Sequence, residues 1–145
     1  MRTFYRHKKY DGSMDPEVIP LCDAINMLPG IRTFESCCGH GKAPFMIFMR
    51  VSTRPGPREL RQEGLFFLTR CVDFRYWKYG STWKIELQVG EVMSPNGDLP
   101  VIYMLHSGDV RGAEAYDQAN DLLQNMVYHL NHKNFMRGYR LLNYI

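Results

Sequence analysis

Apolar residues recur at helical spacing in three segments of the chain. The first follows Asp15-Pro16, an acceptor side chain and a proline typical of a helix start, and it ends at Pro29-Gly30. Pro20 predicts that the regular helix begins late, and Gly64 weakens the second helix, residues 58–72. The third helix spans residues 112–131. The stripes are Val18, Leu21, Cys22, Ile25 and Leu28; Leu60, Leu65, Phe66, Leu68 and Cys71; and Ala115, Ala119, Leu122, Leu123, Met126, Val127 and Leu130.

Between these helices the pattern predicts strands at residues 31–35, 45–51, 82–89 and 101–107. Residues 45–51 are apolar on both faces, which predicts a central strand. Residues 82–89 alternate, with Trp83, Ile85, Leu87 and Val89 on the face that we expect to be buried. The order helix, two strands, helix, two strands, helix predicts an α/β (α+β) fold, with helices packed on a mostly antiparallel sheet.

Length and composition fit one folded unit. The chain has 145 residues, of which 45% are hydrophobic and 23% charged, so we expect a single domain over residues 1–145. Residues 1–14 are expected to form an arm or edge strand, and residues 135–145 a last strand. A net charge of +3 does not by itself indicate a nucleic-acid partner. No apolar run suits a membrane span or a secretory signal, so we expect a cytoplasmic protein with no membrane partner and with free cysteines.

The densest group of reactive residues is the segment FESCCGHGKAPF, from Phe34 to Phe45. Gly39 and Gly41 can adopt positive φ, which lets successive N–H groups converge on an anion such as a phosphate. His40 and Lys42 add donors beside them. The alternative is a glycine-rich hairpin turn that holds no ligand.

The same segment raises two further possibilities. Cys37, Cys38 and His40 are competent zinc ligands, but adjacent cysteines on an extended chain point in opposite directions, and Cys71 or His106 would have to complete the set. We therefore predict no metal site. A cysteine beside histidine and lysine could be an activated nucleophile, yet the sequence identifies no third, orienting group. We expect at least one of the adjacent cysteines to face the core.

Two other segments carry candidate binding residues. RYWKYGSTW, residues 75–83, places aromatic rings among cations, which suits base stacking, the alternative being an aromatic strand end. LHSGDVRG, residues 105–112, ends a strand with donors for a pocket, unless Ser107 and Asp109 cap the next helix. The predicted ligand-binding residues are Glu35, Ser36, Cys37, Cys38, Gly39, His40, Gly41, Lys42, Arg75, Trp77, Lys78, Tyr79, His106, Ser107, Asp109 and Arg111.

Residues 13–41, SMDPEVIPLCDAINMLPGIRTFESCCGHG, resemble the N-terminal signature of the tRNA wybutosine-synthesizing protein 3 family. In that family an acidic helix start and a helix ending in IN or LN precede a strand and a Ser-Cys-x-Gly-Arg turn, and here His40 stands in place of the arginine. The resemblance implies one repeat of a two-repeat fold, with the turn in the functional cleft. It also implies S-adenosylmethionine-dependent methylation of a modified guanosine in tRNA. A single repeat would expose a sheet edge, which predicts a homodimer.

Three functions follow from these observations. We favour a protein that binds a nucleotide-type ligand, meaning a nucleotide, a nucleotide signal or an RNA end. Its cleft would be built from residues 35–42, with help from residues 75–79 and 106–111. The alternatives are an RNA methyltransferase with S-adenosylmethionine as cofactor, and a non-catalytic interaction protein. The sequence has no evident pair of carboxylates for acid–base work, which counts against hydrolysis.

Overall fold

The computed structural model describes residues 14–51, 58–89 and 101–131. The predicted order of helices and strands is confirmed, and the fold is a mixed α+β arrangement. The predicted terminal strand and, except for Met14, the predicted arm lie outside the described residues. The elements are η2 (Pro16–Val18), α1 (Ile19–Asn26), β1 (Ile31–Cys37), η3 (Gly39–Gly41), β2 (Pro44–Val51), α2 (Arg58–Tyr79), β3 (Lys84–Val89), β4 (Val101–Arg111) and α3 (Gly112–Asn131).

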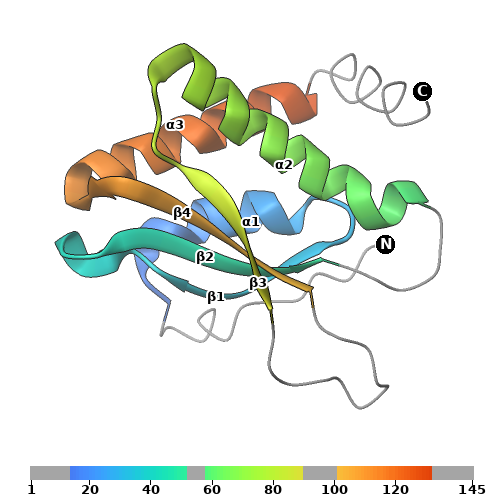
Figure 1. Ribbon diagram of the computed structural model, residues 1–145, viewed down its shortest axis with the longest axis horizontal. Coiled ribbons are helices and arrows are strands. Elements are labelled where there is room, and N and C mark those ends of the chain that lie inside the picture. The colour runs from blue at the N-terminus through green and yellow to red at the C-terminus, as the bar shows by residue number, and fades with distance from the viewer. Residues whose placement is uncertain (1–13, 52–57, 90–100, 132–145) are drawn as a thin grey trace.

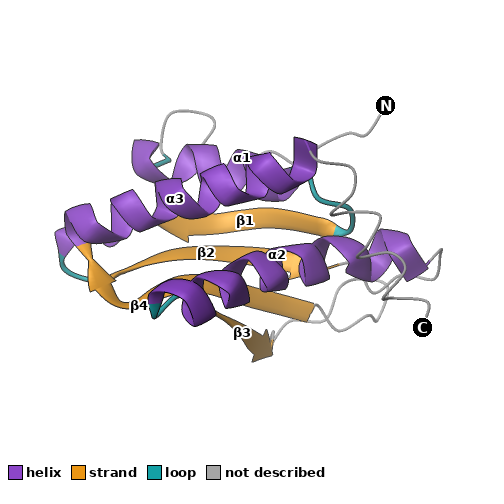
Figure 2. Ribbon diagram, turned by 90° about the horizontal axis from the view of Figure 1, so that it is seen from above, coloured by secondary structure: helices purple, strands orange, loops and turns teal. Residues whose placement is uncertain are grey.

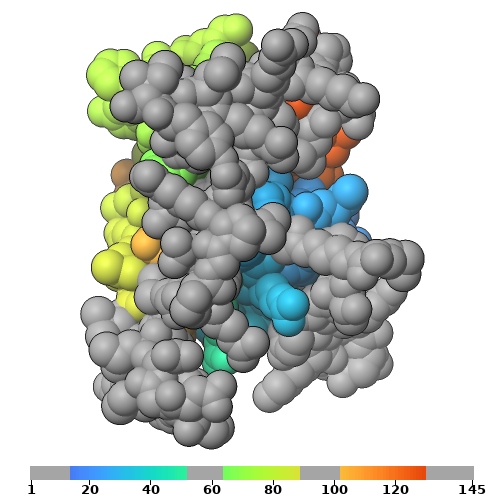
Figure 3. Space-filling view, turned by 90° about the vertical axis from the view of Figure 1, so that its right-hand side faces the viewer, coloured from blue at the N-terminus to red at the C-terminus, as the bar shows by residue number. Residues whose placement is uncertain are grey.

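The four described strands form one antiparallel sheet in the order β1-β2-β4-β3 (Figure 1). β2 lies inside the sheet, as its apolar sequence predicted, and β1 and β3 are the edges. Figure 3 shows these edges apart, with β3 in yellow and the chain around α1 and β1 in blue to cyan. Between Thr33 and Glu35 the register shifts by one residue, so Phe34 forms a bulge in β1.

The three helices cover one face of this sheet (Figure 2). Burial alternates along β2, where Phe45, Ile47 and Met49 are fully buried toward the helices. All five residues of the stripe predicted for the first helix are buried, although Val18 lies in η2 and Leu28 lies beyond the end of α1. On α3, Ala115, Ala119, Leu122 and Met126 are buried as predicted, whereas Val127 is exposed. We call the side of the sheet that faces these helices the covered face, and the other side the open face.

The junction of α1 and β1 is fixed by two polar groups. α1 begins one residue before Pro20, which agrees with the predicted late start. Asp15 makes no helix-capping hydrogen bond; instead its Oδ2 accepts from the N–H of Cys38 at 2.9 Å. Asn26 donates to Thr33 Oγ1 at 2.7 Å and accepts from the Thr33 N–H at 2.8 Å. These buried amide contacts join the end of the helix to the strand.

α2 is longer than predicted, because it continues past residue 72 to Tyr79. Residues 75–79 therefore belong to a helix, and the alternative of an aromatic strand end is wrong. Gly64 weakened the prediction of this helix but lies within it, and a Cβ there would be only 2.2 Å from the carbonyl oxygen of Pro29. The missing side chain lets α2 cross the loop after α1 at close range. In the described part of the chain, no helix has an apolar stretch long enough to cross a membrane.

β4 is also longer than predicted and runs directly into α3 at Gly112. Ser107 and Asp109 lie within this strand, so the alternative that they cap the next helix is wrong. The hydroxyl of Ser107 accepts from the N–H of Phe45 at 3.0 Å and donates to the carbonyl of Val110 at 2.7 Å. Ser107 therefore fastens the end of β4 to the start of β2.

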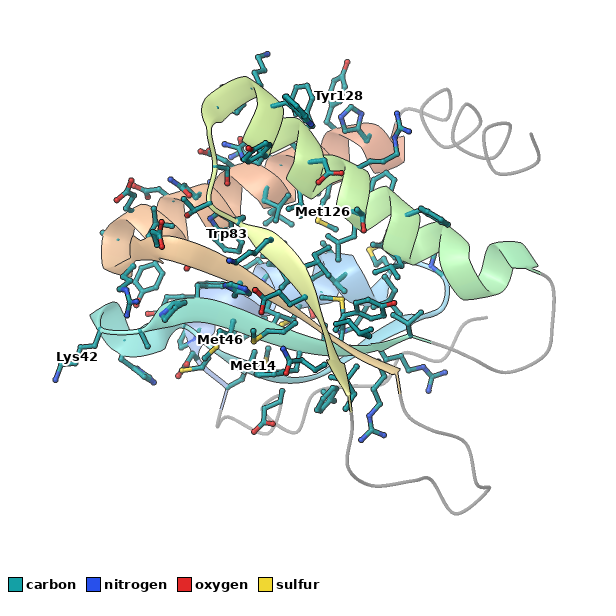
Figure 4. The ribbon with its side chains drawn as sticks, viewed as in Figure 1. Met14, Lys42, Met46, Trp83, Met126 and Tyr128 are labelled. Carbon is teal, nitrogen blue, oxygen red and sulfur yellow. The ribbon has the colours of Figure 1, made fainter. Side chains whose placement is uncertain are left out.

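The residues of the third strand leave the core as the strand proceeds. Trp83 is buried just before β3, with its ring 5.3 Å from that of Phe45 and its Nε1 donating to Gln118 of α3 at 2.8 Å (Figure 4). Ile85 is half-buried, and Leu87 is 60% exposed. The predicted buried face of this strand is thus confirmed only at its beginning.

Candidate functional site

The turn between β1 and β2 has an unusual backbone. Gly39, His40 and Gly41 all have positive φ, at 83°, 51° and 79°, which confirms the expectation for the two glycines. A Cβ on Gly39 would lie 2.9 Å from the carbonyl oxygen of Pro44, whereas on Gly41 it would meet nothing within 4 Å. A positive φ at a residue other than glycine is uncommon. The turn around His40 therefore holds its backbone in a left-handed conformation.

Most N–H groups of the turn point at acceptors of the protein itself. The donors are Cys38 to Asp15 Oδ2 (2.9 Å), Gly39 to Cys37 Sγ (3.3 Å), His40 to Cys38 Sγ (3.4 Å), and Lys42 and Ala43 to the carbonyl of Gly39 (3.0 Å each). The carboxylate of Asp15 accepts the N–H of Cys38, and sulfur or carbonyl acceptors of the turn take the other four, so these five groups are already bonded within the protein. The turn is thus less able to bind an anion through its backbone than its glycine spacing indicates.

The side chains of the two adjacent cysteines lie in different environments. Cys37 pairs with Met46 on the open face and is half-buried. Cys38 is 3% exposed and belongs to the core, which confirms that one of the two faces inward. Its hydrogen bond with the hydroxyl of Tyr116, helped by burial, raises the pKa of Tyr116 to about 12.

Asp15 is the residue that sequence reasoning missed at this site. Its carboxylate, the Cys37 thiol and the His40 ring offer ligand atoms that all lie within 4.8 Å of one another. His40 Nε2 is 3.7 Å from Asp15 Oδ2, and His40 Nδ1 is 3.6 Å from Cys38 Sγ. The sequence marked Asp15 only as a helix start, because its partners are far along the chain. It can complete a ligand set with Cys37 and His40 in place of Cys71 or His106.

The same contacts bear on the nucleophile alternative. Cys38, His40 and Asp15 follow one another as thiol, imidazole and carboxylate, which is the order of a catalytic triad. The third, orienting group that the sequence did not reveal is therefore present. Cys38 is nevertheless 3% exposed, so a substrate has little access to its sulfur. The arrangement suits ligand positioning better than covalent catalysis.

The open face of the sheet is a second candidate surface. Phe34 and Phe48 lie there with ring centroids 6.2 Å apart, and the guanidinium carbon of Arg50 is 4.9 Å from the centroid of Phe34. Arg32 is directly opposite Arg50 in the register. The register places these residues on the face: Arg32, Glu35 and Cys37; Met46, Phe48 and Arg50; Ile102, Met104 and His106; Lys84, Glu86 and Gln88. Sequence reasoning missed this surface because β2 is apolar on both sides.

His106 connects the open face to the polar end of β4. Its Nδ1 accepts from the N–H of Gly108 at 3.2 Å, so Nε2 carries the proton and points at Glu86 Oε1, 3.2 Å away. This contact with His106 is the main reason that the pKa of Glu86 is lowered, and Lys84 Nζ at 3.5 Å adds to it. His106 also lies in the same cross-strand row as Cys37, next to the turn.

Two of the three predicted segments come together. Arg111 Nη1 donates to the carbonyl of Lys42 at 2.6 Å, and a Cβ on Gly112 would lie 3.6 Å from Gly41 Cα. The end of β4 therefore packs against the turn. Of the predicted residues there, Ser36 and Ser107 are buried, whereas Glu35 and Asp109 are exposed.

Residues 75–79 make their described contacts elsewhere. Arg75 Nη2 is 3.5 Å from Asp121 Oδ2 of α3, and Lys78 Nζ is 5.5 Å from the ring centroid of Tyr79. Trp77 is 82% exposed on the same helix end. The side chain of Lys42, at the turn, points away from the body of the protein (Figure 4). The described contacts of Arg75 and Lys78 thus belong to α2 and α3 rather than to the turn.

No protein-family model, curated protein or solved structure matches the chain. The resemblance of residues 13–41 to the wybutosine family, including the half-size fold, therefore remains a prediction from those residues.

Proposed function

We propose that this protein binds a nucleotide-type ligand, a segment of single-stranded RNA, on the open face of its sheet. The observation that carries the proposal is the ring pair Phe34–Phe48 with Arg50 against it, on a face that no described helix covers. Unpaired bases stack on aromatic rings and on guanidinium planes. The two rings offer adjacent stacking surfaces, and the arginine serves both stacking and phosphate contact.

The charges on this face support an anionic ligand. Arg32 and Arg50 lie directly opposite each other in neighbouring strands, where like charges are destabilising. A phosphate between the two guanidinium groups would relieve that repulsion and gain charge-assisted hydrogen bonds. Lys84 supplies a cation at the other end of the face, while Glu35 and Glu86 limit the total attraction. We therefore expect moderate affinity that depends on salt.

Fluorescence anisotropy with a labelled single-stranded RNA tests the proposal. The logarithm of the binding constant should fall with the logarithm of salt concentration by roughly 0.7 per phosphate contacted. Phe48→Ala should lose about 1–3 kcal/mol of binding, and Phe48→Leu, which keeps an apolar side chain but no ring, should lose a similar amount. Arg50→Ala should lower the salt slope. Tyr128→Ala, an exposed ring on α3, is the matched control and should bind normally.

The alternatives give different results in the same assays. Binding of RNA that is unaffected by both Phe48 variants would contradict the open face as its site. Tight, salt-insensitive binding of S-adenosylmethionine in calorimetry, without RNA binding, would favour the methyltransferase. Binding of neither ligand would favour the interaction protein.

We also propose that the protein is a cytoplasmic homodimer. The four cysteines, Cys22, Cys37, Cys38 and Cys71, are free thiols, which fits a reducing compartment. Leu87, 60% exposed on the edge strand β3, is apolar surface that a second copy would bury by pairing there. Sedimentation should give a dimer that Leu87→Lys weakens. A wild-type monomer at micromolar concentration would contradict the dimer.

A further inference from the structure

We propose that Asp15, Cys37 and His40 form a binding site for a divalent metal ion of the zinc class, with a fourth position open to solvent or ligand. The three side chains offer one oxygen, one sulfur and one nitrogen within 4.8 Å of one another. Zinc accepts all three donor types, and three protein ligands with one exchangeable position are typical of its reactive sites. Harder cations such as magnesium avoid sulfur, so the cysteine favours zinc or cobalt over them.

The separations are close to those that a metal needs. Zinc bonds of about 2.0–2.3 Å place the ligand atoms of a tetrahedron roughly 3.3–3.6 Å apart. His40 Nε2 lies 3.7 Å from Asp15 Oδ2, so this edge of the tetrahedron is already near its final length. The side chain of His40 is 68% exposed, which leaves it free to close the remaining distance to the sulfur of Cys37.

Each of the three side chains also has a second contact within the protein. The N–H of Cys38 donates to Asp15 Oδ2, and the N–H of Gly39 donates to Cys37 Sγ. The other ring nitrogen of His40, Nδ1, faces Cys38 Sγ at 3.6 Å, which leaves Nε2 for the metal. Metal-binding side chains are usually oriented by such outer contacts, and losing one typically lowers metal affinity roughly 10–100-fold.

The backbone explains how residues so close in sequence can share one ion. Adjacent cysteines on a strand point in opposite directions, and here only Cys37 is a ligand while Cys38 is an outer contact. The left-handed conformation of residues 39–41 turns the chain back, so that the ring of His40 lies beside Asp15. Asp15 reaches the group from the position just before η2, so the site links the first helical segment to the turn.

Cobalt(II) is the direct probe, because it takes zinc sites and reports its ligands by absorption. Added to the metal-free protein, it should give visible d–d bands of tetrahedral intensity and a sulfur-to-cobalt band in the near ultraviolet. Cys37→Ser should abolish the sulfur band. His40→Asn, which tolerates positive φ, and Asp15→Asn, which keeps an acceptor for the N–H of Cys38, should each weaken cobalt binding at least 100-fold. Cys71→Ala, a buried cysteine of α2, is the control and should leave the spectrum unchanged.

Further additions test the class of metal and the open position. One equivalent of zinc should displace the cobalt, and azide should shift the visible bands by taking the fourth position. A cobalt spectrum without the sulfur band, or one that survives Cys37→Ser in a folded protein, would overturn the site. A spectrum insensitive to azide would overturn the open position. These assays contain no RNA, so their failure would leave the proposed RNA binding unaffected.

Discussion

The two faces of the sheet use the same strands for different purposes. On β2, Phe45, Ile47 and Met49 are fully buried against the helices, while Met46 and Phe48 are only half-buried on the other side. On the covered side, Asn26 and Thr33 satisfy each other's polar groups by two hydrogen bonds. The open face carries the half-buried rings of Phe34 and Phe48 beside the exposed side chains of Arg32 and Arg50. An apolar residue in a strand thus indicates a core position only after its face is known.

The largest effect is expected when Phe45 and Phe48, two rings on opposite faces of β2, are each replaced by alanine. Phe45→Ala should destabilise the protein by about 3–5 kcal/mol, because it empties a fully buried site beside Trp83. Phe48→Ala should cost about 1 kcal/mol, since its ring is half-buried. Urea unfolding of both variants gives the two free energies. Equal losses would mean that the open face is part of a core.

Alkaline pH should lower the stability of the protein through Cys71, a buried residue of α2. Burial raises the pKa of Cys71 from 9.0 to about 12, so its contribution is present below pH 9 and is lost as pH rises to about 12. The loss is at most about 4 kcal/mol, at roughly 1.4 kcal/mol per pKa unit. Unfolding free energies at about pH 8 and about pH 11 should differ less in Cys71→Ala. In Cys71→Ala the free energy of unfolding should still fall above pH 10, because the pKa of Tyr116 is raised from 10.0 to about 12.

At Gly64, where α2 packs against the loop after α1, the usual stabilising effect of a glycine-to-alanine substitution in a helix should be reversed. Alanine in place of glycine normally stabilises a helix interior by roughly 0.5–1 kcal/mol. Gly64→Ala should instead destabilise by about 1–3 kcal/mol, because its Cβ would collide with the carbonyl of Pro29. Thermal unfolding measures the sign, with Gln124→Ala on the exposed side of α3 as control. A stabilised Gly64→Ala would show that α2 does not pack so closely.

Acid should lower the stability of the protein through Glu86 on the open face, and we expect this effect to be the smallest of the four. The pKa of Glu86 is lowered by the contact with His106, so its stabilising contribution is present above pH 4.5 and is lost as pH falls through the folded value. Glu86 is exposed, so salt should screen the effect. Melting temperatures between about pH 6 and about pH 3 should fall less steeply in Glu86→Gln than in the wild type.

Local pattern predicted the parts of the fold that depend on neighbouring residues. The stripe of α1, the central place of β2 and the positive φ at Gly39 and Gly41 all follow from spacing or residue type. The ends of α2 and β4 were missed, because residues 73–79 and 108–111 have no clear period. Gly64 weakened the prediction of α2 because its role, a close contact with the loop at Pro29, cannot be read from neighbouring residues.

The candidate sites were predicted less well, because they join residues that are far apart in sequence. Asp15 meets Cys37 and His40 only after α1 and β1 have packed together. The ring pair of Phe34 and Phe48 requires the register of two strands and the bulge between them. Sequence reasoning located the turn but could not identify which of its N–H groups were already bonded.

The bulge in β1 makes the ring of Phe34 separable from the rest of the strand. Glu35, Ser36 and Cys37 would keep their partners Phe48, Ile47 and Met46 if Phe34 were deleted, because the strand has one residue more than the ladder uses there. Removal of one residue elsewhere in β1 would turn every later side chain to the opposite face. A lineage could therefore add or remove a stacking ring by a single-codon insertion or deletion, with the core left in place.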